Sequence, residues 1–261
     1  MRGAVPTAAT RALPAVARYA LALGDDALVL SHRLGEWVAH APELEEDVAL
    51  ANIGLDLLGQ ARTLLTYAGE VEGQGRDEDD LAYLRDGRDY LNLQLCEQPN
   101  GDFAVTMARL LLFSTYALAL YGDLAASSDA TLAGVAGKAV KEVAYHRDHA
   151  TSWVLRLGDG TDVSRARMQT GLDATWPYVA EMFDGSWLNP RLVDGGVAVD
   201  VGRLRPAWDA RIAQVLADAT LERPSPTWQA TGGRQGIHSE ALGLLLAEMQ
   251  HVHRSHPGAR W

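Results

Sequence analysis

The feature that most constrains the fold is a long, almost entirely apolar segment at residues 48–65. It is too long for an ordinary strand, and its Ala and Leu content favours a helix. A helix that is apolar nearly all round must be buried on most sides, so we expect it to be the central helix of a bundle. Its main polar residues, Asn52, Asp56 and Gln60, recur at every fourth position and are expected to share one inward face.

Helix-length patterns fill most of the remaining chain, and the connections between them contain Gly, Pro and Asn. We predict helices at residues 14–39, 43–71, 78–97, 102–126, 130–157, 162–183, 206–222 and 237–253. Residues 187–203 combine Asn-Pro, Asp-Gly-Gly and alternating valines, which predicts a loop with a short extended piece. Short connections favour antiparallel neighbours, so we predict an all-α fold with one domain at 1–261 and a flexible tail at 1–13.

Composition argues against several classes of partner. The chain has 23 Lys and Arg against 34 Asp and Glu, a formal charge of −11, and lacks the basic stripe of a nucleic-acid-binding protein. Its single cysteine, Cys96, excludes an intrachain disulfide and a cysteine-rich metal site. Arg18 interrupts the first apolar stretch, and the longest uncharged run, residues 110–122, is short for a membrane span. We therefore expect a cytoplasmic protein that binds neither nucleic acid nor membrane.

Helical bundles can hold a pair of iron ions when two helices each supply a Glu and two others each supply Glu-x-x-His. This chain has no complete set. Glu142 and His146 are four residues apart, with Val143 at the ligand spacing, and an ordinary hydrogen-bonded pair explains them. Glu248 and His251 form a literal Glu-x-x-His near the end of the sequence, where a surface pair is the simpler interpretation. Whether Glu248 and His251 bind a metal is left open.

The polar residues of the central helix favour a buried hydrogen-bond network over a substrate site. An unpaired buried polar group costs about 1–3 kcal/mol, so a central helix must pair its polar side chains. We assign to this network Asn52, Asp56, Gln60, Glu142 and His146. No catalytic residue is predicted, because the sequence contains neither a phosphate-binding glycine loop after a strand nor a nucleophile elbow.

Several segments, in order along the chain, resemble the C subunits of bacterial ring-1,2-phenylacetyl-CoA epoxidases, the PaaC family. The longest is His-Ala-Pro-Glu-Leu-Glu-Glu-Asp-Val-Ala-Leu-Ala-Asn-Ile-Gly-Leu-Asp-Leu-Leu-Gly-Gln-Ala-Arg, at residues 40–62. The others are Leu-Gly-Asp-Asp-Ala-Leu-Val-Leu at 23–30, Lys-Glu-Val-Ala-Tyr-His at 141–146, Met-Gln-Thr-Gly-Leu-Asp-Ala-Thr-Trp-Pro at 168–177, Gly-Ile-His-Ser-Glu at 236–240 and Leu-Ala-Glu-Met-Gln at 246–250. The resemblance implies a ferritin-like helical bundle with additional helices.

The resemblance also implies that the di-iron centre is carried by a homologous A subunit. Its central-helix motif, Asp-Glu-x-Gly-His, corresponds here to Asp-Leu-Leu-Gly-Gln, so Leu57 stands in place of a ligand Glu and Gln60 in place of a ligand His. Its later Lys-Glu-Glu-x-x-His corresponds to Lys-Glu-Val-Ala-Tyr-His, so Val143 replaces a ligand Glu and His146 is kept. We therefore predict a degenerate metal site and no metal or other cofactor in this chain.

A first ligand Glu falls near Asp26 or Ala27 in the same comparison. The resemblance thus implies a non-catalytic structural subunit that stabilises and positions the catalytic A subunit, together with the other subunits of the complex, in aerobic phenylacetate catabolism. Self-association of the chain alone, and the face that binds the A subunit, are left open.

Two other functions also stay open. The chain could itself be a metal-dependent ferritin-like oxidoreductase, which metal analysis of the purified protein would reveal. Alternatively, it could be a helical module that binds a CoA thioester. That function needs clustered cations, and the sequence offers only scattered ones such as Arg33, Arg62 and Arg109.

Overall fold

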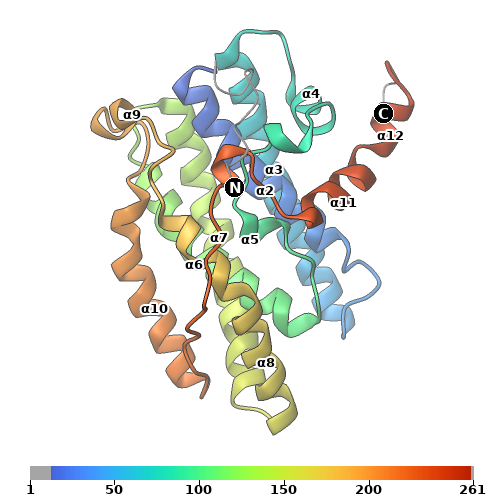
Figure 1. Cartoon of the computed structure of the whole chain (residues 1–261), viewed down its shortest axis with the longest axis vertical. Helices are drawn as coiled ribbons and strands as arrows, with labels where there is room; N and C mark the ends of the chain where they lie inside the picture. The colour runs from blue at the N-terminus through green and yellow to red at the C-terminus, as the bar shows by residue number, and fades with distance from the viewer. Residues whose placement is uncertain (1–12, 260–261) are drawn as a thin grey trace. The chain divides into compact units, whose positions relative to one another are not determined.

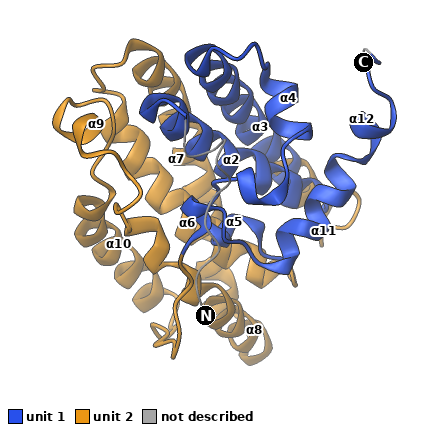
Figure 2. Cartoon of the chain, turned by 45° about the horizontal axis from the view of Figure 1, so that its top comes forward, with its two compact units in different colours: residues 1–38, 50–99, 232–261 blue, residues 39–49, 100–231 orange. Residues whose placement is uncertain are grey.

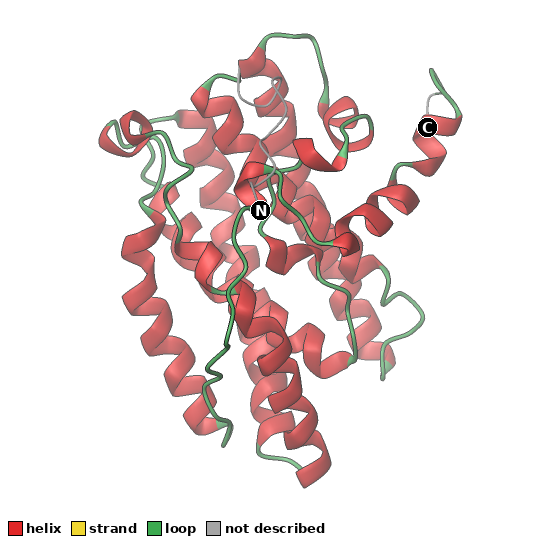
Figure 3. Cartoon of the chain, in the orientation of Figure 1, coloured by secondary structure: helices red, strands yellow, loops and turns green. Residues whose placement is uncertain are grey.

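The computed structural model describes residues 13–259, and every regular element in this range is a helix (Figure 1, Figure 3). The α-helices are α2 (Ala15–Gly35), α3 (Leu44–Glu72), α4 (Glu78–Tyr83), α5 (Gln94–Glu97), α6 (Phe103–Leu124), α7 (Ala130–Gly158), α8 (Asp162–Thr175), α9 (Pro190–Asp194), α10 (Arg205–Asp218), α11 (Glu240–Met249) and α12 (His251–Ser255). The 3₁₀-helices are η1 (Gly87–Asp89), η2 (Trp176–Tyr178), η3 (Ala180–Phe183), η4 (Val201–Leu204) and η5 (Gly233–Gln235). The predicted all-α fold class is confirmed.

The chain divides into two compact units (Figure 2). The first contains residues 1–38, 50–99 and 232–261, and the second contains residues 39–49 and 100–231. Helix α3 begins in the second unit and continues without a break into the first. The prediction of a single domain stays a prediction, and the predicted tail at 1–13 lies outside the described residues except for Leu13.

In the first unit, α2 and α3 pack closely against each other. A Cβ atom at Gly24 would lie 3.0 Å from Cδ2 of Leu65, so a glycine suits this point of contact. Further along, the Ser31 hydroxyl of α2 donates a 2.8 Å hydrogen bond to the Gly54 carbonyl of α3. Helix α5 also packs against α2. Helix α2 carries two buried acids, Asp25 and Asp26, so α5 lies beside the helix that holds them.

The second unit is built around α6, which packs against α7, α8 and α10. Gly171 of α8 lies so close to α6 that a Cβ atom there would be 2.9 Å from the Ala104 carbonyl oxygen. The Trp208 indole of α10 donates a 3.0 Å hydrogen bond to the Leu112 carbonyl of α6. Among the described helices, α6 is long and apolar enough to cross a membrane, but 78% of its most apolar window is buried, as expected of a core helix.

Three predicted helices are shorter in the structure or are interrupted. The prediction at 78–97 is wrong in its middle, because the backbone N–H groups of Leu91 and Leu93 donate to carboxylates on α2 instead of continuing a helix. Pro177 ends α8 early and leaves two 3₁₀ turns up to Phe183. The last predicted helix starts only at Glu240 and is interrupted after Met249. The predicted loop at 187–203 contains the short helix α9 and the start of η4, its extended piece is limited to residues such as Asp200, and no strand occurs among residues 13–259.

The prediction that α3 is buried nearly all round is wrong as well. Leu44 and Leu55 are 76% and 63% exposed, and Val48 and Leu58 are 54% and 41% exposed. The opposite face is buried, as the fully covered Leu64 illustrates. Helix α3 therefore has one buried and one exposed face, although both faces carry apolar residues.

Candidate functional site

The four residues in the predicted ligand positions are all buried. Leu57 and Gln60 lie on the buried face of α3 in the first unit, and Val143 and His146 lie on the buried face of α7 in the second. Leucine and valine carry no donor atom, so two of these positions cannot ligate a metal ion. Their interpretation as a degenerate metal site stays a prediction.

The proposed buried network around α3 needs a correction. Gln60 and His146 are buried, but Asn52 is exposed, and Asp56 and Glu142 are half-buried. A four-residue step advances about 40° around a helix beyond a full turn. Asn52, Asp56 and Gln60 therefore turn gradually from the solvent side to the buried side, and Asn52 does not belong to a buried network.

Glu142 and a neighbouring pair on α7 do not complete a metal site. Glu142 lies 3.5 Å from the ammonium group of Lys138, an ordinary ion pair one turn away. In the second unit, Nε2 of His149 lies 3.1 Å from Oε2 of Glu46. Burial lowers the pKa of His149, and the charge of Glu46 opposes this effect. These residues supply pairs of donors, and a closed metal site needs more.

Near the first expected ligand position, Asp26 of α2 is paired with a buried arginine. Its two carboxylate oxygens accept hydrogen bonds of 2.6 and 3.0 Å from the Arg234 guanidinium. One of them also accepts the Leu93 backbone N–H at 2.7 Å. Burial raises the pKa of Asp26, and the Arg234 charge opposes this shift. The carboxylate is bound in the bidentate geometry that arginine favours and offers little to a metal ion.

The adjacent Asp25 has a separate buried arginine. Its Oδ2 accepts a 3.0 Å hydrogen bond from Nη1 of Arg85 and a 2.8 Å hydrogen bond from the Leu91 backbone N–H. The Arg85 guanidinium also lies 4.2 Å from the centre of the Tyr90 ring. Burial alone would lower the pKa of Arg85, but the charge and hydrogen bond of Asp25, together with the charges of Tyr90 and Asp89, raise it overall, so the arginine stays charged.

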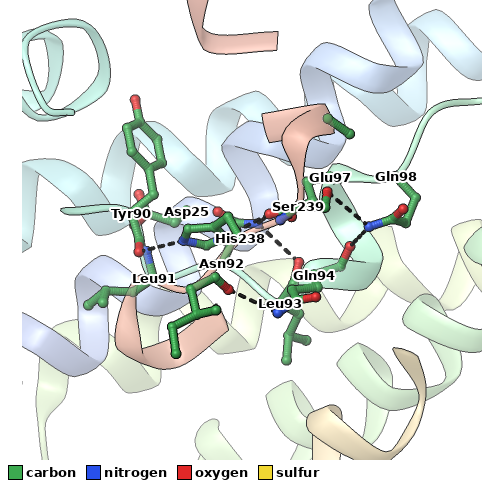
Figure 4. A network of polar contacts seen from close by, with 12 residues as sticks. Asp25, Tyr90, Leu91, Asn92, Leu93, Gln94, Glu97, Gln98, His238 and Ser239 are labelled. Carbon is green, nitrogen blue, oxygen red and sulfur yellow. Dashed lines mark hydrogen bonds and ion pairs between the residues drawn. The ribbon is translucent and has the colours of Figure 1, made fainter. Parts of the chain in front are cut away.

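A third buried carboxylate, Glu97 of α5, receives three donors (Figure 4). Its Oε2 lies 2.7 Å from Nδ1 of His238 and accepts Nδ2 of Asn92 at 2.9 Å, and its Oε1 accepts the Ser239 backbone N–H at 2.6 Å. Nε2 of His238 lies 2.9 Å from the Tyr90 carbonyl oxygen. Both ring nitrogens thus face acceptors, which suits a protonated imidazole.

The pKa of His238 reflects this environment. Burial lowers the pKa, but the hydrogen bond and charge of Glu97, together with the Tyr90 carbonyl and the charge of Asp25, raise the pKa above its ordinary value. Gln250, just after α11, adds a further contact through its side-chain amide, which donates to the Arg85 carbonyl at 3.0 Å and the Tyr90 hydroxyl at 3.2 Å. Burial raises the pKa of Tyr90 to about 12, so its hydroxyl stays protonated.

We call this set of residues the polar clamp; it comprises Asp25, Asp26, Arg85, Tyr90, Asn92, Glu97, Arg234, His238 and Gln250. The clamp lies within the first unit and joins three stretches that are far apart in sequence: α2, residues 85–97 and residues 234–250. Its three carboxylates are each paired with a basic side chain. Such a network holds backbone segments together and leaves no free carboxylate for acid–base chemistry.

The donor set of the chain does not fit a di-iron centre. Among the residues that the structure describes, no group of three His, Cys, Asp or Glu side chains is placed to hold a metal ion. Glu248 and His251, the literal Glu-x-x-His, are both exposed. We therefore derive no metal chemistry for this chain.

Sequence reasoning missed the clamp, although a signal for it was present. The segments at 23–30, 236–240 and 246–250, which resemble the epoxidase C subunits, contain Asp25, Asp26, His238 and Gln250. Periodicity alone gives these residues no special weight, because they are spread over three segments that lie far apart in the sequence. Their contacts become apparent only in the folded chain.

The helical fold, with hydrocarbon side chains in expected ligand positions, defines a bundle protein without a complete metal site of its own among its described residues. Residues 4–261 match the model of a family described as phenylacetic acid catabolic protein. The chain is also 50% identical over 243 residues to the C subunit of the 1,2-phenylacetyl-CoA epoxidase of Escherichia coli (strain K12), covering 93% of this chain and 98% of that protein. The chain belongs to the phenylacetic acid catabolic protein family, and the resemblance found in its sequence is confirmed.

Proposed function

We propose that this chain is a non-catalytic structural subunit of a multi-subunit phenylacetyl-CoA epoxidase in the cytoplasm. A homologous A subunit would hold the di-iron centre and oxygenate the ring of phenylacetyl-CoA. The present chain would stabilise and position that subunit. The Escherichia coli relative is named as the C subunit of such an enzyme, which supports a place in an assembly of several different chains.

The observation that carries this proposal is the chemistry of the residues in the ligand positions. Leu57 and Val143 are buried hydrocarbon side chains where the resemblance places ligand carboxylates. Asp26, near another ligand position, is neutralised by Arg234 at 2.6 Å. A chain that has replaced its metal ligands while keeping a well-packed helical body is suited to support a partner.

The proposal is tested by comparing the chain purified alone with the chain co-expressed with the A subunit. Elemental analysis should find far less than one iron per chain in the pure protein, and iron in the complex in proportion to the A subunit. Omitting the chain should reduce the amount of soluble, active A subunit. About two irons per chain in the pure protein, or full activity of the A subunit without this chain, would contradict the proposal.

A further inference from the structure

The sequence contains one Asn-Gly pair, Asn100-Gly101, which comes just before α6. The other asparagines, Asn52, Asn92 and Asn189, are followed by Ile, Leu and Pro. Asparagine is among the thermolabile residues of proteins, because its side-chain amide can lose ammonia when the next backbone nitrogen attacks it. A following glycine favours this attack, since it has no side chain to hinder the approach and its backbone is conformationally permissive.

The backbone at Gly101 is open to this reaction. Gly101 is exposed and has a φ of +60°, a conformation that glycine adopts without strain. Within residues 13–259, its backbone N–H donates no hydrogen bond. Helix α6 begins only at Phe103, and the carboxylate that caps it, Asp102, accepts from the Val105 N–H instead. The nitrogen that must attack is therefore not held by the helix.

The Asn100 side chain is held by a buried arginine of the same unit. Its Oδ1 accepts a hydrogen bond from Nη2 of Arg109, which is fully buried on α6. Attack at Cγ moves the electron pair of the C=O bond onto Oδ1, so negative charge develops at the atom that the guanidinium already contacts. A fixed donor at such an oxygen stabilises the tetrahedral intermediate, as it does in acyl transfer. Asn100 itself is only half-buried, so water reaches the site.

We propose that Asn100 is a site of spontaneous deamidation, with the Gly101 nitrogen as nucleophile and Arg109 as the donor to the developing oxyanion. The Gly101 nitrogen loses its proton to solvent and forms a bond to Cγ of Asn100. The bond from Cγ to Nδ2 then breaks, and the amide nitrogen takes a proton from water and leaves as ammonia. Water adds to either carbonyl carbon of the resulting succinimide and opens the ring, which gives aspartate or isoaspartate.

The net reaction consumes one water and releases one ammonia, so it needs no oxidant or other co-reactant. Both products change the surroundings of Arg109. Aspartate places a negative charge against the guanidinium, which strengthens the hydrogen bond between them. Isoaspartate lengthens the backbone by one carbon before Gly101 and alters the Asn100 carbonyl, which now accepts the Thr106 hydroxyl at 3.1 Å. The proposal concerns the chain by itself and does not rest on the function proposed above.

The first experiment incubates the folded, full-length chain and follows every asparagine by peptide mass spectrometry. Conversion of the amide to an acid raises the mass of the peptide and adds a negative charge. We expect conversion at Asn100, faster at alkaline than at neutral pH because the attacking nitrogen must lose its proton. Asn52 and Asn189 are both exposed and serve as internal controls for accessibility. No conversion at Asn100, or conversion at Asn52 at an equal or higher rate, would overturn the proposal.

The second experiment tests the nucleophile with an isoaspartyl methyltransferase, which labels isoaspartate and leaves aspartate unlabelled. Label should accumulate in the peptide that contains residue 100. Asn100→Gln should abolish it, because ring closure from the longer side chain is much slower, and Asn52→Gln should leave it unchanged. Aspartate formed without any isoaspartate would indicate direct hydrolysis by water and would exclude Gly101 as the nucleophile.

The third experiment tests the contribution of Arg109. The peptide Gln-Pro-Asn-Gly-Asp, which corresponds to residues 98–102, contains the reacting pair but lacks the arginine. Because Arg109 stabilises the developing charge, the folded chain should release ammonia from Asn100 at least as fast as the peptide does under the same conditions. A folded chain that reacts more slowly than the peptide would refute the role of Arg109.

Discussion

Replacing Glu97 with Gln should destabilise the protein more at acidic pH than at alkaline pH. Glu97 is fully buried, and its carboxylate accepts from His238, Asn92 and the Ser239 backbone. A Gln side chain has the same shape but only one oxygen. If that oxygen keeps the His238 and Asn92 hydrogen bonds, the amide N–H₂ group faces the Ser239 N–H and leaves one donor unpaired.

The magnitude follows from two separate losses. One stranded buried donor costs about 1–3 kcal/mol of unfolding free energy at any pH. When His238 is protonated, loss of the Glu97 charge also leaves a buried cation unpaired, and breaking such a pair raises the total cost to about 3–5 kcal/mol. The second loss is absent when His238 is neutral, so the cost should fall toward about 1–3 kcal/mol as the pH rises.

The measurement is urea-induced unfolding followed by far-ultraviolet circular dichroism, on both sides of the ordinary histidine pKa of about 6.5. A double-mutant cycle with His238→Gln should give a coupling energy of at least about 1 kcal/mol at acidic pH. Glu240→Gln, an exposed substitution at the start of α11, is the control and should change stability by less than about 0.5 kcal/mol. A Glu97→Gln cost below about 0.5 kcal/mol at both pH values, or additive single substitutions, would refute this account of the clamp.

Three further predictions concern the other buried polar groups. The wild type should be more stable than His238→Gln, and this advantage should be complete below the unfolded-state histidine pKa of about 6.5. The advantage should decline as the pH rises through the higher folded-state pKa of His238, because the folded chain holds the proton more tightly. Equal dependence of stability on pH in the two proteins would contradict this prediction. Asp26→Leu should lower the free energy of unfolding by about 3–5 kcal/mol, because it leaves the buried Arg234 unpaired. Adding Arg234→Met should recover part of this loss, as measured by thermal unfolding. Absence of any recovery would count against a paired charge. Gln60→Ala should lower the free energy of unfolding by about 1–3 kcal/mol and reduce complex formation, because Gln60 is buried. The control Thr63→Ala, at an exposed position, should change neither. A hundredfold lower epoxidation rate with intact assembly would mean that Gln60 acts in catalysis.

The sequence predicted the helical fold well because helix periodicity and terminal residues are local properties. Asp102 caps α6 and Asp129 caps α7 through their side chains, and both helices begin within one residue of the predicted positions. The burial of α3 was not predictable in the same way. An apolar residue such as Leu55 looks the same in sequence whether it faces a core or an interface with another chain, so periodicity could not separate the two faces.

The polar clamp was out of reach of pattern reading for a different reason. Arg85 lies 60 residues from Asp25, and Arg234 lies 208 residues from Asp26, so neither pair shares a helix turn or a motif. The interruption of the predicted helix at 78–97 has the same origin, since Leu91 and Leu93 donate their N–H groups to these acids. A local preference for helix is overridden when distant carboxylates need donors.

The clamp gives the two buried acids of α2 cationic partners that belong to the chain itself. In a metal-holding bundle, cations neutralise the inward-facing carboxylates. In this chain, Arg85 and Arg234 place guanidinium groups 2.5 and 2.6 Å from Asp25 and Asp26 on α2. An arginine is tethered to the backbone, so each ion pair also fixes the segment that carries it, which a bound ion does only through its ligands. Because an uncompensated buried charge costs several kcal/mol, the loss of either arginine would free the segment it holds and strand its acid at once. The two arginines thus join α2 to two other stretches of the first unit: Arg85 ties it to residues 85–97, and Arg234 ties it to the C-terminal segment.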